Sequence, residues 1–372
     1  MIILAAILAI FVYGMIAAML GTILPNLSER FQLTPRQNGN IAMAQAIGLI
    51  IASVSVGPLV DNQGKKFGLV LGLALVAIAL FVLPKAGGYR SIMAYLFLLG
   101  LGGGIIVTGG NALVSDISEE RRATVLNLLN LFFGLGGLAT PFISANLLKK
   151  DAVKLCYLTA VLTAGTLIVN FSAPIPPPAG ERGFRFAEMG QLTGAPALYL
   201  LALLLFLYVA CEVGVWNWLP RHLIAQGIDE GRALNILSLG FALGLLLGRV
   251  AVAPILMTVE SNTVTLAASL LMVITTYLAL QTREPKISWV AVFCAGIAMA
   301  PVFPTTLAMV GDRFPVATAT AMGVVITCGW IGLAVSSKII GGIAGGDPRR
   351  LKKALLVLPA FSLAMVLVHL GL

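Results

Sequence analysis

The stretch FLYVACEVGVWNWLP, residues 206–220, is almost wholly apolar but carries an acid, Glu212, near its middle. As a helix it places Tyr208, Glu212 and Trp216 at i, i+4 and i+8, along one face. A carboxylate at the centre of a membrane helix costs about 2.5–3.5 kcal/mol on insertion scales, so such residues face a bundle interior or a wet cavity. Hydrogen-bonding and stacking groups, Asn217 among them, lie beside it. The stretch therefore predicts a membrane helix that lines a solute pathway.

The composition of the whole chain agrees with a membrane location. Of its 372 residues, 59% are hydrophobic and only 10% are charged, whereas soluble domains carry about 25% charged residues. The apolar runs have the length of membrane helices, unlike the ten-residue alternating segments of a membrane barrel. Because no long polar stretch remains to build a soluble domain, we expect an all-α integral membrane protein and not an enzyme.

Charge and cysteine usage narrow the expected partners. The net charge is +9, and the basic residues gather in short connectors between apolar runs, a pattern typical of contact with the lipid bilayer. No basic and aromatic stripe suggests nucleic acid. The four cysteines lie singly inside apolar runs and the two histidines are far apart. We therefore expect no disulfide, no metal site and no cofactor.

Twelve apolar runs are each long enough to cross the hydrocarbon core. They cover residues 2–24, 38–60, 67–84, 91–114, 123–147, 152–171, 197–224, 233–257, 263–280, 287–310, 317–342 and 354–370. A longer connector with the run Pro174-Ile175-Pro176-Pro177-Pro178 separates six runs from six. The expected organisation is an N-terminal bundle at residues 1–172, a central cytoplasmic connector at 173–196 and a C-terminal bundle at 197–372.

The two halves repeat at a spacing of 195 or 196 residues. The first spacing lays Phe11 and Tyr13 on Phe206 and Tyr208, and Gly137 on Gly332; the second lays Gly48 on Gly244 and Asp116 on Asp312. A spacing of 195 or 196 residues thus relates four pairs of predicted helices. It predicts two pseudo-symmetric six-helix bundles, with a site between them near mid-membrane.

The connector after the second run reads Gly57-Pro58-Leu59-Val60-Asp61-Asn62-Gln63-Gly64-Lys65-Lys66. It resembles the signature loop of the major facilitator superfamily, in which a glycine is followed by Leu, Asp, Gly and a basic pair. A glycine allows two helices to approach closely or makes a turn, and the aspartate can cap a helix or pair with a base. The resemblance implies a gate on the cytoplasmic side. Its residues would be Gly57, Asp61, Gly64, Lys65 and Lys66, joined by Arg249 of the eighth run.

Other motifs are similar to the fucose-permease-like branch of that superfamily, whose members are sugar–proton symporters. They are Leu126-Asn127-Leu128-Leu129-Asn130 in the fifth run, Phe303-Pro304-Thr305-Thr306 in the tenth and Gly248-Arg249 in the eighth. The chain departs from this branch where Gly21 and Val107 stand in place of acids. Glu212 is then the one mid-helix carboxyl that could couple transport to an ion.

Glu212 therefore has several possible roles. Desolvation could make it a carrier of a proton near neutral pH. It could instead hold a sodium ion together with backbone carbonyls, or accept a hydrogen bond from a sugar hydroxyl. The structural alternative is that Glu212 ties the helix at residues 197–224 to its neighbours, for instance to Arg249.

Amides and aromatic rings in the interior are the candidates for solute contact. Amides donate and accept at once, which suits a polyhydroxylated solute, and an indole can stack on the apolar face of a sugar ring. The candidates are Gln45, Asn111, Asn127, Asn130, Tyr208, Trp216, Asn217 and Trp330. The alternative for the amides is interhelical hydrogen bonding, worth about 0.6 kcal/mol per bond in membranes.

The basic residues and the signature loop predict opposite orientations. If the chain starts inside, the cytoplasmic connectors hold seven bases, and the outer connectors with the adjacent helix ends hold fifteen, among them Lys149, Lys150, Lys352 and Lys353. This reverses the usual bias. We orient the chain by the signature loop, which belongs inside. One hypothesis is that the outer bases attract an anionic solute.

The resulting hypothesis is a monomeric, multi-pass transporter of the bacterial inner membrane. It would move a small polar solute, foremost a sugar, by alternating access, with Glu212 coupling transport to H⁺ or Na⁺. An alternative is efflux of amphiphilic drugs or lipids. An alternative of another class is a membrane sensor that binds solute without transporting it.

Overall fold

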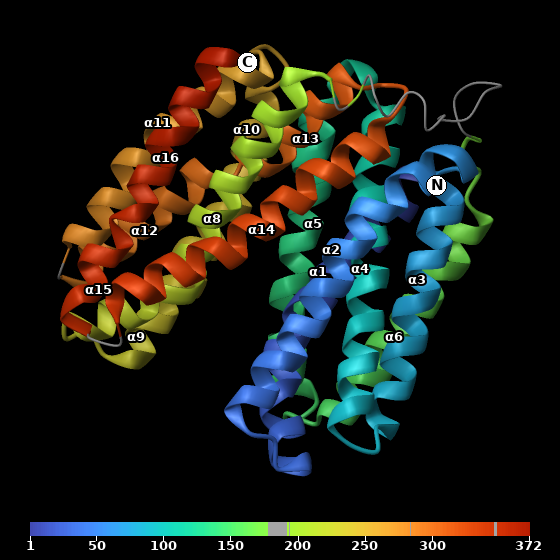
Figure 1. Ribbon diagram of the computed structural model, residues 1–372, viewed down its shortest axis with the longest axis horizontal. Helices are drawn as coiled ribbons and strands as arrows, with labels where there is room; N and C mark the ends of the chain where they lie inside the picture. The colour runs from blue at the N-terminus through green and yellow to red at the C-terminus, as the bar shows by residue number, and fades with distance from the viewer. Residues whose placement is uncertain (178–191, 193, 283, 346–347) are drawn as a thin grey trace. The chain divides into compact units, whose positions relative to one another are not determined.

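The computed structural model describes residues 1–177, 192, 194–282, 284–345 and 348–372. The regular secondary structure in these ranges is helical throughout (Figure 1). Twelve helical spans within them are long and apolar enough to cross a membrane, with a mean hydropathy between 1.5 and 2.7 in their most apolar windows. The prediction of an all-α chain with twelve spans is confirmed.

Most predicted spans correspond to one helix. The first half contains α1 (Ile2–Phe31), α2 (Pro35–Gln63), α3 (Lys65–Val82), α4 (Tyr89–Ile117), α5 (Arg122–Phe142) and α6 (Ala152–Ser172). The second half contains α8 (Pro196–Ala225), α9 (Glu230–Asn235), α10 (Leu243–Ile255), α11 (Ser261–Gln281), α12 (Pro285–Met299), α13 (Val302–Arg313), α14 (Thr318–Ala344), α15 (Pro348–Leu355) and α16 (Val357–Val368). A π-helical segment, Ile236–Ala242, joins α9 to α10, and another, Ile143–Leu147, follows α5.

Prolines explain where the helices depart from the prediction. Helix α1 continues to Phe31 instead of ending near residue 24, and Pro25 lies inside it. Membrane helices tolerate proline because neighbouring helices satisfy the freed backbone groups. The predicted tenth helix, 287–310, is instead two helices, α12 and α13. Pro301 lies between them, and it lacks the N–H that would continue the helical ladder.

Side-chain caps fix several helix starts, those of α2 and α6 among them. The hydroxyl of Thr34 accepts a hydrogen bond from the Gln37 backbone N–H at 3.3 Å, and the Gln37 side chain accepts one from the Thr34 N–H at 2.9 Å, which forms a capping box for α2. Asp151 caps α6 by accepting from the Lys154 backbone N–H at 3.1 Å. That bond is the main reason why the pKa of the Asp151 carboxyl lies below its ordinary value.

The chain divides into two compact units. Unit 1 contains Met1–Ile117, Leu129–Glu188 and Phe314–Gly323, and unit 2 contains Ser118–Leu128, Met189–Arg313 and Val324–Leu372. The units therefore follow the two halves of the sequence except at the starts of α5 and α14, which belong to the unit of the other half. The predicted bundle limits at 172 and 197 stay a prediction, and 178–191 and 193 of the connector lie outside the described residues.

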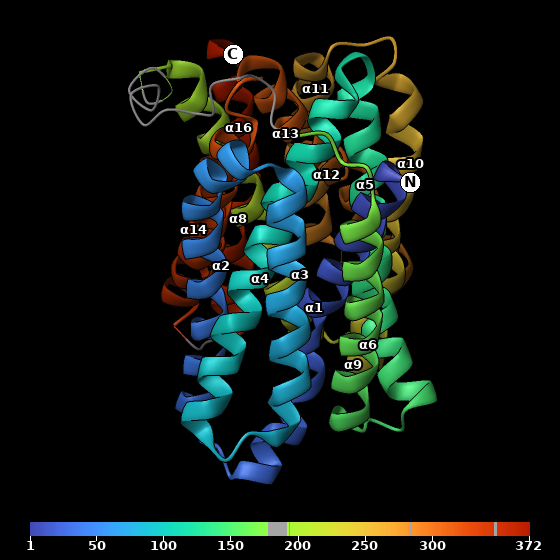
Figure 2. The same ribbon diagram turned by 90° about the vertical axis from the view of Figure 1, so that its right-hand side faces the viewer.

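Each unit is a set of closely packed helices. In unit 1, α4 lies beside α2 and α3, and α6 lies beside α1 and α3 (Figure 2). In unit 2, α11 contacts both α12 and α16, and α8 contacts α16 and α13 (Figure 1). The core of each unit lies between these helices.

Equivalent contacts within the two units show the internal repeat. A methyl group added at Gly48 would collide with the Phe97 carbonyl oxygen, and one added at Gly244 would collide with that of Phe293. Both partners are 196 positions apart in the sequence. The Thr140 hydroxyl donates to the Met15 carbonyl at 3.0 Å, and in unit 2 the Ser336 hydroxyl donates to the Ala210 carbonyl at 2.6 Å. The repeat predicted from the sequence is thus present in the packing.

The crossing of α2 with α4 and the equivalent crossing of α10 with α12 each pair a glycine with an alanine, but the two residues lie on opposite helices of the pair. In unit 1, a methyl added at Gly104 of α4 would lie 2.8 Å from the Cβ of Ala52 in α2. In unit 2, a methyl added at Gly248 of α10 would lie 2.6 Å from the Cβ of Ala300, just after α12. Positions 52 and 248 are equivalent in the repeat, as are 104 and 300. The glycine and the alanine have therefore exchanged helices between the two units.

Candidate functional site

The carboxylate of Asp61 binds the start of α14 within unit 1. It accepts hydrogen bonds from the backbone N–H groups of Ala319 and Thr320 at 3.2 and 2.9 Å, and from the Thr320 hydroxyl at 2.7 Å. Asp61 is 5% exposed. A buried anion at the first free amides of a helix also interacts favourably with the helix dipole. The prediction that Asp61 caps a neighbouring helix agrees with this geometry.

Lys65 lies between two carboxylates. Its Nζ is 3.4 Å from Asp61 and 2.8 Å from Asp116. Two glycines make the arrangement possible: a methyl at Gly57 would lie 2.5 Å from the Thr320 Cα, and Gly64, with φ of 96°, forms the turn between α2 and α3. The structure therefore brings four of the six predicted gate residues together.

The other two predicted gate residues lie elsewhere. Lys66 donates to the Ala173 carbonyl at 3.0 Å and stacks over the Phe171 ring, so it is tied to the end of α6. Arg249 is buried in α10, in unit 2. Their assignment to the gate stays a prediction that these contacts do not support.

A second set of contacts occupies the equivalent place in unit 2. The Thr124 hydroxyl, at the start of α5, donates to the Ala253 carbonyl at 3.1 Å, and positions 124 and 253 repeat positions 320 and 57. The Arg122 guanidinium forms an ion pair with Asp312 at the end of α13. Arg122 and Thr124 are not among the site residues predicted from the sequence, although the 196-residue spacing applied to Gly57 gives Ala253, the partner of Thr124.

The amides of unit 1 form a hydrogen-bonded pair. Asn130 of α5 donates to the Asn111 side-chain oxygen at 2.9 Å, and Asn111 of α4 donates to the Val107 carbonyl at 2.8 Å. Both residues are buried, whereas Gln45 of α2 is half-buried. The pair joins α4 to α5, which is the interhelical alternative considered for these amides.

Asn127 belongs to a different set of contacts from Asn130. Its amide donates to the Ala123 carbonyl at 2.9 Å and to the Thr305 hydroxyl of α13 at 3.0 Å, both within unit 2. The two asparagines are three residues apart on α5, but one contacts α13 and the other contacts α4.

Glu212 lies in a cluster with Tyr208 and Arg249 inside unit 2. Tyr208 and Arg249 are 0% and 5% exposed, and Glu212 is half-buried. The Tyr208 hydroxyl interacts electrostatically with both charged groups, and its ring lies 6.5 Å from that of Phe303 in α13. A carboxyl and a guanidinium thus both act on one buried phenol, and protonation of the carboxyl would change the net charge of the cluster.

The remaining predicted solute residues are dispersed over α8 and α14. Trp216 makes an edge contact with the Phe241 ring, with centroids 5.3 Å apart. Asn217 is exposed and donates to the Ser337 hydroxyl at 3.5 Å. The indole nitrogen of Trp330 is buried without a hydrogen-bond partner. Of the three, Trp330 has the polar atom that a bound solute could satisfy.

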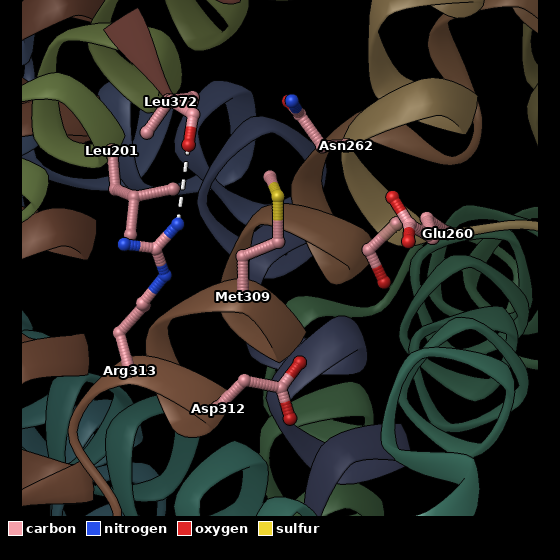
Figure 3. A pocket seen from close by; sticks show the side chains of 8 residues that line it. Leu201, Glu260, Asn262, Met309, Asp312, Arg313 and Leu372 are labelled. Carbon is pink, nitrogen blue, oxygen red and sulfur yellow. Dashed lines mark hydrogen bonds between the residues drawn. The ribbon is translucent and has the colours of Figure 1, made fainter.

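A separate cavity of about 260 Å³ lies at the end of α13 in unit 2 (Figure 3). It is lined by Leu201, Glu260, Ser261, Asn262, Met309, Asp312, Arg313 and Leu372. Arg313 donates to the Leu372 oxygen across it at 3.1 Å. Because these residues lie at helix ends, the cavity is distinct from the mid-span cluster around Glu212. In the described part of the chain, no three His, Cys, Asp or Glu residues are grouped to hold a metal ion.

Twelve apolar spans in two repeats, with amide and ionisable groups buried in mid-span, define a multi-pass membrane transporter and not an enzyme. The particular family follows from comparison with known proteins. The sequence profile of the Major Facilitator Superfamily matches residues 6–337, and the chain belongs to that superfamily. The resemblance drawn from residues 57–66 is confirmed.

The individual relatives have low sequence identity to this chain. A glucose/galactose transporter of Brucella abortus is 26% identical over 322 residues, which cover 81% of this chain and 78% of the relative. A protein TsgA homolog of Erwinia tasmaniensis is 21% identical over 337 residues, covering 89% and 84%. A crystal structure of FucP in the outward conformation matches with a TM-score of 0.86 at 17% identity, covering 99% and 98%. At this identity the structural match shows the shared fold alone.

Proposed function

We propose that this transporter carries a sugar across the bacterial inner membrane by alternating access, in symport with protons through Glu212. The name of the Brucella abortus relative, a glucose/galactose transporter, supports the solute class. The E. coli fucose:proton symporter FucP, which shares the fold, supports both the solute class and the coupling ion. The bacterial origin of these relatives supports the proposed location in a bacterial inner membrane.

The position of Glu212 is the observation that carries the proposal. Among the acids of the described spans, Glu212 alone lies in the middle of its helix, whereas Asp61 and Asp116 lie within the last turn of theirs. A carboxyl kept at this depth is expensive, and such groups mark ion and solute pathways. Tyr208, which interacts electrostatically with both Glu212 and Arg249, gives the carboxyl the polar surroundings that a proton carrier needs.

Protonation of Glu212 would change the charge of its cluster. With the carboxyl ionised, the charges of Glu212 and Arg249 sum to zero; with the carboxyl protonated, the cluster carries one positive charge. That change alters the balance between desolvation and attraction for charges buried in a low dielectric. Binding of a proton at Glu212 would therefore shift the equilibrium between transport states.

Uptake by proteoliposomes tests the proposal. The purified protein is reconstituted, and uptake of labelled glucose, galactose and fucose is measured with an inward proton gradient, an inward sodium gradient, or none. We expect accumulation of at least one neutral hexose with the proton gradient only. Accumulation driven only by sodium, or uptake of an acidic sugar but of no neutral one, would contradict the proposal.

Glu212→Gln separates coupling from solute binding. We expect this variant to exchange labelled for unlabelled sugar without a gradient, but to lose accumulation. The matched control is Glu260→Gln, which neutralises an exposed acid just before α11 in the same unit and should accumulate sugar normally. Full gradient-driven accumulation by Glu212→Gln would show that Glu212 is not the coupling residue.

A further inference from the structure

The turn after α5 places two consecutive lysines in the left-handed region of the backbone. Lys149 and Lys150 have φ of 51° and 62°, and both side chains are exposed. Non-glycine residues are disfavoured there because Cβ comes too close to the following carbonyl oxygen. Two such residues in succession indicate that the lysine side chains are kept against a conformational cost.

The internal repeat provides the comparison. Gly345, at the end of α14, is 196 positions after Lys149 and has φ of 56°. The second half of the chain thus has a glycine at the position of Lys149, where a positive φ carries no strain. Lys149 differs from this glycine by a charged side chain.

Basic residues follow the equivalent turn as well. Helix α15 is strongly amphipathic, with Leu351, Ala354 and Leu355 buried against α8 and α16. Its other side carries Lys353, which is exposed, and Lys352, which donates to the Gln281 side chain at 2.7 Å. Because the apolar side of α15 packs against α8 and α16, its basic side faces away from them. This basic side lies at the start of the twelfth span.

These bases form no ion pair among the described residues, and the acid next to them in the sequence, Asp151, pairs with Lys154 instead. Among the described residues, no carboxylate lies within 4 Å of Lys149, Lys150 or Lys353, whereas Lys154 is paired with Asp151 at 3.3 Å. Large exposed apolar side chains precede the lysine turn: Phe142 is 61% and Leu147 is 68% exposed. A cationic group above an apolar surface matches a phospholipid, whose phosphate lies above its acyl chains.

We propose that the Lys149–Lys150 turn and the basic side of α15 form two pseudo-equivalent binding sites for anionic phospholipid headgroups. The lysine turn lies at the far end of the span that contains α5, and α15 follows the span that contains α14, so the repeat makes the two sites equivalent. A soluble anion would satisfy the charges but not the exposed apolar side chains, which favours lipid as the occupant. The proposal is independent of the solute carried.

Two double substitutions at the lysine turn test the lipid-binding proposal, because they separate the loss of the lysine charges from the relief of the backbone strain. Lys149→Gly with Lys150→Gly removes both the charges and the strain, and Lys149→Ala with Lys150→Ala removes only the charges. Thermal unfolding is followed in nanodiscs of phosphatidylcholine and of phosphatidylcholine mixed with phosphatidylglycerol. Native mass spectrometry gives the affinity for phosphatidylglycerol.

We expect phosphatidylglycerol to stabilise the unsubstituted protein and to bind it more tightly than phosphatidylcholine does. Each removed base should weaken binding roughly fivefold. In phosphatidylcholine alone, the glycine pair should unfold at a higher temperature than the alanine pair. Lys353→Gln should weaken binding at the second site, and Arg121→Gln, an exposed base at the start of α5, serves as the control on the opposite surface.

Two results would overturn the proposal. One is an undiminished response to phosphatidylglycerol in both turn variants and in Lys353→Gln. The other is an equal stabilisation by soluble glycerol phosphate in phosphatidylcholine nanodiscs, which would assign these bases to a free anion instead of a lipid.

Discussion

Removal of the Asp61 charge should release the start of α14. Three donors and the Lys65 ammonium converge on this carboxylate, and a hydrogen bond to a charged group contributes about 1.5–3 kcal/mol against about 1 kcal/mol for a neutral pair. Asp61→Asn keeps one acceptor oxygen and replaces the other by a donor. We estimate a loss of about 3 kcal/mol, which is roughly a 150-fold increase in the opening equilibrium.

Hydrogen exchange measures this opening directly. The amides of Ala319 and Thr320 donate to Asp61, so their exchange in Asp61→Asn should accelerate roughly 150-fold if exchange follows local opening. Asp116→Asn is the matched control: it removes the other partner of Lys65 but no acceptor of these amides. Unchanged protection at 319 and 320 in Asp61→Asn, or equal acceleration in the control, would refute the reasoning.

Two further predictions concern packing and pH. Alanine at Gly48 or at Gly244 should lower the stability of the corresponding unit by about 1–3 kcal/mol through overpacking, measured by thermal unfolding; Gly21→Ala, with open space around it, should cause no loss, and a loss there equal to the other two would contradict the packing argument. Asp151 has a lowered pKa in the folded protein, so its ionised form stabilises the fold above the ordinary value near 4, and this contribution disappears as the pH falls through the lowered value. The difference in unfolding temperature between the unsubstituted protein and Asp151→Asn should therefore shrink below about pH 4, and a constant difference from pH 7 to 3 would exclude the effect.

The spans were predictable because the bilayer imposes their length and composition, whereas their ends were not. The first apolar run predicts a helix that ends near residue 24, yet α1 continues past Pro25. Pro301, in contrast, does separate two helices. Whether a proline ends a membrane helix depends on the neighbours that satisfy the freed carbonyl, and these neighbours are distant in the sequence.

The repeat was predictable in outline but not to the residue. By identity, Gly137 matches Gly332 at a spacing of 195. In the structure, Gly136 is the residue that contacts the Phe11 carbonyl as Gly332 contacts that of Phe206. Apolar helices are rich in glycine, so identity alone finds neighbouring matches by chance, and only the packing partner decides between them.

The candidate site shows the same limit. The residue types around Asp61 predicted a cap, but its partners in α14 are 258 and 259 positions away and no local pattern indicates them. Lys66 follows Lys65 directly in the signature loop, yet its side chain points to the end of α6. Adjacent residues of a helix face different neighbours, so a motif read as one unit can serve two contacts.

The exchanged glycine and alanine at positions 52, 104, 248 and 300 bear on how this transporter can vary. Each crossing contains one methyl group, which Ala52 of α2 supplies in unit 1 and Ala300, just after α12, supplies in unit 2. Within one unit the two sides are not interchangeable, because a methyl at Gly104 would also lie 2.6 Å from the Leu49 carbonyl oxygen, which Ala52→Gly leaves in place. The methyl can therefore change helices between related chains only if the backbone at the crossing shifts with it.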